Sequence, residues 1–171
     1  MKILAILFLL SIQLLAQSRK EGTYLMPVNA HDTVKHRNFL DAKGNKLGLW
    51  QYYSQEGFLS LTVNFKNNKR QGEYVRYQSN TNLVFEKGSY LNGYKHGSYE
   101  RYYSDGSIRV KGTYENGEKV GEWLYYHKES GTVRMKGKYV DGKKHGKWVM
   151  LDQAQIVKQE VQYQNGLLVN Y

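Results

Sequence analysis

A glycine followed two residues later by tryptophan or tyrosine recurs at a nearly constant spacing along this chain. The five pairs are Gly48 with Trp50, Gly72 with Tyr74, Gly97 with Tyr99, Gly121 with Trp123 and Gly146 with Trp148, so successive glycines lie 24, 25, 24 and 25 residues apart. A second series has the same repeat length. In each unit an aromatic residue opens a turn of the form aromatic-x-(Asn or Asp)-(Gly or Asn). Its members are Phe65, Tyr90, Tyr114, Tyr139 and Tyr163. So regular a period predicts a repeat protein with an elongated surface.

Residues 1–16 have the features of a secretory signal peptide. Lys2 precedes an apolar run from Ile3 to Leu10, and the small residue Ala16 offers a cleavage site before Gln17. The run is shorter than the about 20 apolar residues that span a bilayer. An uncleaved amphipathic anchor is the alternative. We expect an exported protein, located in the periplasm or cell envelope or released from the cell.

Residues 17–171 are expected to form one domain without disulfides, because the chain contains no cysteine. Loss of Lys2 takes the net charge from +10 to +9. The segment 17–38 shows no period and is expected to be an extended arm, and residues 39–171 are expected to form the repeat domain. With 16 tyrosines, the core must be largely aromatic.

The clearest unit, residues 97–121, predicts consecutive β-hairpins. Residues 97–103 and 108–114 alternate as strands do, and Asp105-Gly106 and Asn116-Gly117 favour the positive φ angles of primed turns. The predicted fold is therefore all-β, an elongated single antiparallel sheet of about ten strands, with the last residues as a terminal cap.

Alternation also predicts which side chains share a face. Gly88, Gly112 and Gly137 recur at one register, as expected where a large ring lies over the backbone. Glu86 and Gln159 interrupt the apolar series and are interpreted as edge or groove positions. A further ring follows three residues after the first in four units, as with Tyr99 and Tyr102. Either a bulge intervenes or both faces carry rings, and the sequence leaves both options open.

The pattern Tyr-x-(Asn/Asp)-Gly-x-x-x-Gly-x-(Trp/Tyr) resembles the MORN repeat in its bacterial variant form. The matching segments are 90–99, 114–123 and 139–148, with weaker copies at 65–77 and 41–53. The resemblance spans residues 41–171. It implies a stack of β-hairpins that acts as a scaffold, a dimerisation element, or a phospholipid or protein contact. Bacterial members are often labelled antitoxins, a role that in an exported protein would require a toxin acting at the envelope.

Two sets of residues are candidates for ligand contact. The loops between the glycines form a predicted basic stripe of Lys69, Arg70, Lys95, His96, Lys119, Lys143, Lys144 and His145. Such a stripe suits anionic lipid, cell-wall glycan or an acidic partner, although solvated turns that guard exposed strands are the favoured explanation. The second set is an aromatic ladder of Trp50, Tyr74, Tyr99, Trp123 and Trp148. These rings suit sugar stacking, but cross-strand packing is the favoured interpretation.

No catalytic or metal site and no cofactor are predicted. The histidines lack the spacing of a metal-binding motif, and the local group of His31, Asp32 and His36 is interpreted as a polar linker. Export also argues against nucleic acid as a partner. The sequence therefore predicts a non-enzymatic module that binds another protein or organises a complex, with a binder of anionic lipid or glycan as the alternative. The identity of the partner and the oligomeric state stay open.

Overall fold

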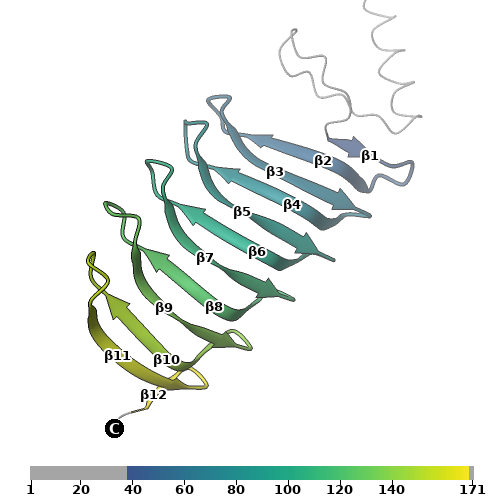
Figure 1. Cartoon of the computed structure of the whole chain (residues 1–171). Helices are drawn as coiled ribbons and strands as arrows, with labels where there is room; N and C mark the ends of the chain where they lie inside the picture. Colours follow the sequence, from purple (N-terminus) through teal and green to yellow (C-terminus); the bar gives the residue numbers. More distant parts are fainter. Residues whose placement is uncertain (1–37, 170–171) are drawn as a thin grey trace, which may run out of the picture.

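Twelve antiparallel strands form one open sheet in strict chain order (Figure 1). The computed structural model describes residues 38–169, so the predicted signal peptide and all but the last residue of the predicted arm lie outside the described residues. The strands are β1 (Phe39–Leu40), β2 (Lys46–Tyr53), β3 (Leu59–Lys66), β4 (Lys69–Tyr77), β5 (Val84–Leu91), β6 (Tyr94–Tyr102), β7 (Ile108–Glu115), β8 (Glu118–Tyr126), β9 (Val133–Val140), β10 (Lys143–Leu151), β11 (Val157–Gln164) and β12 (Leu167–Val169). The prediction of a single sheet of consecutive hairpins is confirmed. Among residues 38–169, no helix is long and apolar enough to cross a membrane.

Along one side of the sheet, the strands are joined by two-residue turns of a single type. Asn116 and Gly117, which join β7 to β8, have φ angles of 48° and 90°, and the corresponding turns repeat this pair of positive angles. Two positive angles define the type I′ turn, whose twist matches that of the flanking strands. The turn at Asp105-Gly106 differs from the prediction. There the loop runs over residues 103–107 and only Gly106 has a positive φ, of 87°.

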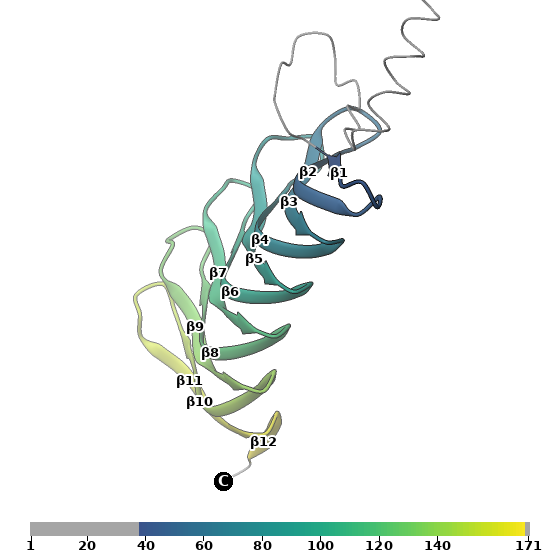
Figure 2. The ribbon, with the colours of Figure 1, turned by 90° about the vertical axis from the view of Figure 1, so that its right-hand side faces the viewer.

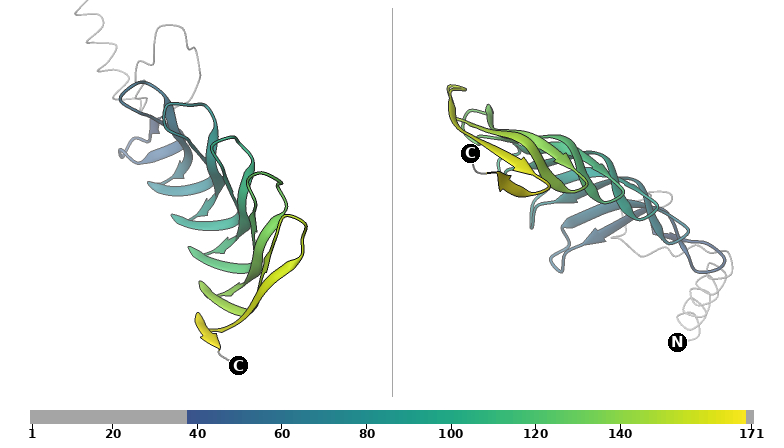
Figure 3. Two further views of the ribbon diagram at one scale, coloured as in Figure 1. Left: turned by 90° about the vertical axis from the view of Figure 1, so that its left-hand side faces the viewer. Right: turned by 90° about the horizontal axis from the view of Figure 1, so that it is seen from below.

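The recurring glycine lies at a bulge that bends each hairpin. In the pairing of β5 with β6, Tyr90 lies opposite Lys95 and Gly88 lies opposite Tyr99, so three residues of β6 face one residue of β5. Gly97, in the middle of the three, has a φ of 84°. A side chain would be strained in this left-handed conformation, which explains why glycine recurs there. Figures 2 and 3 show the hairpins bent in the same sense along the whole sheet.

A second bulge lies toward the other end of each hairpin. Arg101 pairs with Val110 and Tyr102 pairs with Ile108, which leaves Arg109 as the extra residue. The hydroxyl of Tyr99 bonds to Glu86 on one face of the sheet. The hydroxyl of Tyr102 bonds to Glu100, whose side chain lies on the other face because Glu100 follows Tyr99 directly in the strand. Both options that the sequence left open therefore apply, because a bulge is present on the partner strand and rings lie on both faces.

The core occupies one face of the sheet. Its buried apolar residues are Val63, Tyr74, Tyr99, Val110, Trp123, Tyr139 and Trp148. Trp123 is only 1% exposed although no second layer formed by residues 38–169 covers it. Neighbouring rings supply the cover instead, since Tyr114 and Tyr139 both meet Trp123 edge to face. We call this side the aromatic face.

At the C-terminal end, β12 pairs with β11 and forms the edge of the described sheet, as predicted for the terminal unit. Leu167 and Leu168 on this strand are 75% and 53% exposed. The strand is only three residues long. A short edge offers few unpaired backbone groups to another sheet.

Candidate functional site

The predicted aromatic ladder lies in the core. Tyr74 is 2% exposed and Tyr99 7%, Trp123 and Trp148 are each 1% exposed, and Trp50 is half-buried. The ring of Trp148 packs edge to face with Tyr139 at 5.2 Å between centroids. These rings therefore serve cross-strand packing and offer little surface for stacking on a sugar.

Three lysines of the predicted basic stripe cover the aromatic face. The Nζ atoms of Lys95, Lys119 and Lys144 lie 4.8, 4.3 and 4.4 Å from the ring centroids of the aromatic residues four positions later, Tyr99, Trp123 and Trp148. Lys46, which the sequence reasoning missed, lies 4.3 Å from Trp50 in the same way. A cation over a ring face is attracted by the ring quadrupole, so these lysines pack on the core rings and stabilise them.

The glycine bulge explains why a lysine and a ring four residues apart meet. Lys119 pairs with Tyr114 before the bulge, and Trp123 lies on the same face after it. The backbone carbonyl of Lys119 also accepts a hydrogen bond from Gly142 in the next turn, at 3.1 Å. Equivalent bonds join Gly117 to Lys95 and Gly166 to Lys144. Each lysine position thus links two consecutive repeats through both its side chain and its backbone.

The other members of the predicted stripe differ in exposure. Lys69 and Lys143 are exposed at the hairpin ends, and exposed Arg70 lies 5.2 Å from the ring of Tyr90. His96 and His145 are half-buried, and neither has a hydrogen-bond partner within residues 38–169 at its buried Nδ1. The eight basic residues therefore recur beside the two-residue turns along one side of the sheet, but only Lys69, Arg70 and Lys143 are exposed.

A charged row interrupts the aromatic face in its N-terminal half. Glu86 is only 6% exposed and pairs across the sheet with Arg76 on one side and Arg101 on the other. The interpretation of Glu86 as an edge or groove position is wrong, because β5 lies inside the sheet and the carboxylate is buried. The prediction missed Arg76 and Arg101. Aligning the repeats would have found both, because they occupy the positions of Tyr125 and Met150 in later units.

Several donors surround the buried carboxylate. The hydroxyl of Tyr99 donates a hydrogen bond of 2.8 Å to its Oε2, while Lys95 Nζ and Arg76 Nε lie 3.6 and 3.8 Å from its Oε1. Burial raises the pKa of Tyr99, and its hydrogen bond to Glu86 adds to this effect. Burial lowers the pKa of Lys95, and Glu86 opposes that change. We call Arg76, Glu86, Arg101 and Lys95 the charged cluster.

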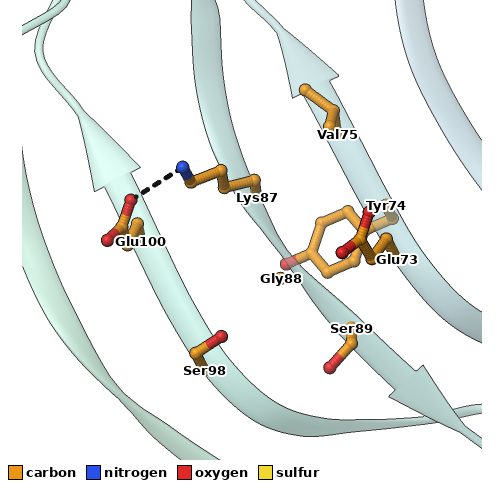
Figure 4. A pocket seen from close by; sticks show the side chains of 8 residues that line it. All are labelled: Glu73, Tyr74, Val75, Lys87, Gly88, Ser89, Ser98 and Glu100. Atoms are coloured by element: carbon orange, nitrogen blue, oxygen red, sulfur yellow. Dashed lines mark ion pairs between the residues drawn. The ribbon is translucent and has the colours of Figure 1, made fainter.

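The opposite face carries polar and charged side chains around a hollow of about 410 Å³ (Figure 4). The hollow is lined mainly by Glu73, Val75, Lys87, Ser89, Ser98 and Glu100. Lys87 and Lys111 lie 3.1 and 3.2 Å from the carboxylate of Glu100, which also accepts a hydrogen bond from Tyr102. These contacts lower the pKa of Glu100 to about 2, with the bond from Tyr102 as the largest cause. The hydroxyl of Ser89 bonds to a backbone carbonyl. The hollow thus offers polar contacts on an open surface.

In the part of the chain that the structure describes, no group of three or more His, Cys, Asp or Glu side chains is arranged to hold a metal ion. The local group of His31, Asp32 and His36, which the sequence analysis interprets as a polar linker, lies outside the described residues.

Comparisons with known proteins leave the chain without a family assignment. No family model matches it, and no curated protein matches it. Among solved structures, a mutant of S. aureus TarM in complex with fondaparinux, alpha-GlcNAc-glycerol and UDP aligns at a TM-score of 0.38 and 13% identity. The alignment covers 78% of this chain and 23% of the TarM chain, so this chain spans about a quarter of that protein. So weak a likeness carries no argument about fold or function.

Proposed function

We propose that this chain is an exported, non-enzymatic repeat protein of the MORN type that binds another protein and organises it at the cell envelope. The observation that carries the proposal is a single-layer sheet, in which no second layer of residues 38–169 covers either the aromatic face or the polar face. Repeat sheets of this kind supply long binding surfaces, because each unit adds area without closing a cavity.

The lysine positions weigh against the alternative of an anionic lipid or glycan ligand. Lys95, Lys119 and Lys144 are held over rings of the core, and the exposed cations left from the predicted stripe are Lys69, Arg70 and Lys143. Surface attraction of a polybasic segment grows with the number of cations near the membrane, so three exposed residues give a weak attraction. An immunity role is a special case of the proposal, in which the bound protein is an envelope-acting toxin.

A pull-down from envelope extract tests the proposal. Residues 17–171 are used as bait at about 0.15 M and about 1 M salt, between which the Debye length falls from about 8 Å to about 3 Å. A first variant carries Lys69→Gln, Arg70→Gln and Lys143→Gln. A matched control removes the same charge from exposed positions of β9, with Arg134→Gln, Lys136→Gln and Lys138→Gln.

We expect the wild-type bait to retain a discrete protein at both salt concentrations, and the first variant to retain it equally. The opposite result is recovery of anionic lipid or glycan alone, lost at high salt and in the first variant but not in the control. That outcome would replace the proposal with the lipid or glycan reading.

A further inference from the structure

The charged cluster departs from a register that is apolar in the other strands from β2 to β10. One row of cross-strand partners crosses the aromatic face, and each member pairs with the next. From β2 to β10 the row reads Tyr52, Leu61, Arg76, Glu86, Arg101, Val110, Tyr125, Met135 and Met150. Three adjacent strands, β4 to β6, replace apolar residues with two arginines and a glutamate.

The fold does not require these charges. Val110 with Tyr125 and Met135 with Met150 fill the same positions in later units of the same sheet. Burying a carboxylate costs desolvation free energy that ion pairs seldom recover in full, and apolar residues of similar volume are often as stable or more so. The charges at this place therefore call for an explanation other than packing.

Cations and donors outnumber acceptors in the cluster. Arg76, Lys95 and Arg101 surround the single carboxylate of Glu86, which leaves two positive charges in excess. The buried Nε of Arg101 and the buried hydroxyl of Tyr74 have no hydrogen-bond partner within residues 38–169. A buried donor without an acceptor is unfavourable, so an added oxyanion that accepts from these donors would be stabilised at the cluster.

The cations are also positioned and accessible. The guanidinium of Arg101 lies 4.3 Å from the centroid of the Phe85 ring, which restrains its plane. The side chain of Arg76 is 53% exposed, so the cluster can be reached from solvent. A planar guanidinium presents paired N–H groups that match a carboxylate.

We propose that the charged cluster binds a carboxylate of an acidic segment of the partner protein. The inference rests on the proposed function, since it names the chemistry of the partner at one place on the sheet. Glu86 favours a carboxylate over a phosphate dianion, because the repulsion between Glu86 and the bound group grows with the charge of that group. Arg76 and Arg101 contact the incoming oxygens, while Lys95 and Tyr99 hold Glu86 in place.

Binding of a labelled oligoglutamate peptide to residues 17–171 tests the cluster directly, with oligoglutamine as the blank. The main variant, Arg76→Met with Glu86→Val and Arg101→Met, restores an apolar row. It removes two positive charges and one negative charge, a net change of −1. Arg134→Met, at an exposed position of β9, makes the same net change away from the cluster. Arg76→Gln is a second variant, at a side chain that is 53% exposed.

We expect the triple variant to fold and to bind oligoglutamate at least about tenfold more weakly, as loss of charged hydrogen bonds implies. Arg76→Gln should weaken binding about threefold or more, and Arg134→Met should change it less than twofold. Equal losses in the triple variant and Arg134→Met would reduce the effect to net charge and overturn the inference. Binding to phosphatidylglycerol vesicles through the cluster, without binding to oligoglutamate, would overturn it as well.

The pull-down separates this inference from the proposed function. If wild type and the triple variant capture a partner protein equally, the proposed scaffold function is supported and the cluster is rejected as the contact with that partner. Oligoglutamate binding that depends on the cluster, with no protein captured from envelope extract, would support the cluster and count against the scaffold.

Discussion

The indole of Trp123 lies so close over Gly112 that a Cβ built on the glycine would come within 2.3 Å of the ring. The same relation holds between Trp148 and Gly137, at 2.2 Å. Gly112→Ala should therefore lower the free energy of unfolding by about 2 kcal/mol or more, because the ring cannot move within the packed ladder. Gly88→Ala should cost less, since the nearest Tyr74 ring atom is 3.1 Å away. Urea denaturation of both variants measures the difference, and equal stabilities would show that the ladder can repack.

The lysines over the rings should contribute to stability. Lys119→Gln is expected to lower the free energy of unfolding by about 0.5–1 kcal/mol, because the cation over Trp123 is lost. Lys143→Gln, at an exposed position in the next hairpin, should have no measurable effect. Tryptophan fluorescence should change in the first variant only. If both variants behave as wild type, the lysines are solvated cations and contribute nothing to the core.

Two buried tyrosines with different hydrogen bonding should respond differently to loss of the hydroxyl. Tyr99→Phe leaves the buried Glu86 without its 2.8 Å donor and should cost about 1–3 kcal/mol. Tyr74→Phe removes a buried hydroxyl that has no partner within residues 38–169, so it should leave stability unchanged or raise it. Denaturation at neutral pH tests the pair. A cost for Tyr74→Phe equal to that of Tyr99→Phe would mean that the Tyr74 hydroxyl is bonded in solution.

Acid should destabilise the protein through Glu100. Its pKa falls from the ordinary 4.5 to about 2 in the folded state, so the folded protein binds this proton less readily than the unfolded chain. The stabilisation is therefore present above about pH 4.5 and is lost as pH falls toward 2. Because Lys87 and Lys111 are nearly half exposed, we expect a loss on the order of 1 kcal/mol. Glu100→Gln should flatten this part of the stability profile. An unchanged slope would assign the acid response to other carboxylates.

The hairpins could be predicted because local rules agree with the global fold. Asn116-Gly117 specifies its turn without help from distant residues. The glycine at position 112 predicts that a large ring, that of Trp123, packs over the backbone there. The turn at Asp105 was predicted less well, since the dipeptide fits both a two-residue turn and the longer loop that forms. In a single-layer sheet nearly all pairing is local in sequence, and for this reason alternation and period carry most of the architecture.

The site could be predicted only in part. The basic residues were identified by type, but the bulge at Gly121 decides that Lys119 turns onto Trp123 instead of toward solvent. Such a bend is not visible in a simple two-residue alternation. Glu86 was noticed as an exception and then placed wrongly, because its partners Arg76 and Arg101 lie on separate strands, each about ten to fifteen residues away, and only the register unites them.

The strict chain order of the strands has a mechanical consequence. Within residues 38–169, β2 pairs only with β1 and β3 and the later strands follow the same rule, so no strand of this segment ties one end of the sheet to the other. Tension applied between residues 38 and 169 meets the outermost hairpin first, and each hairpin that peels away exposes the next. The protein would extend in steps of one repeat under load and rewind when released, behaving as a short molecular spring between whatever is attached at its two ends.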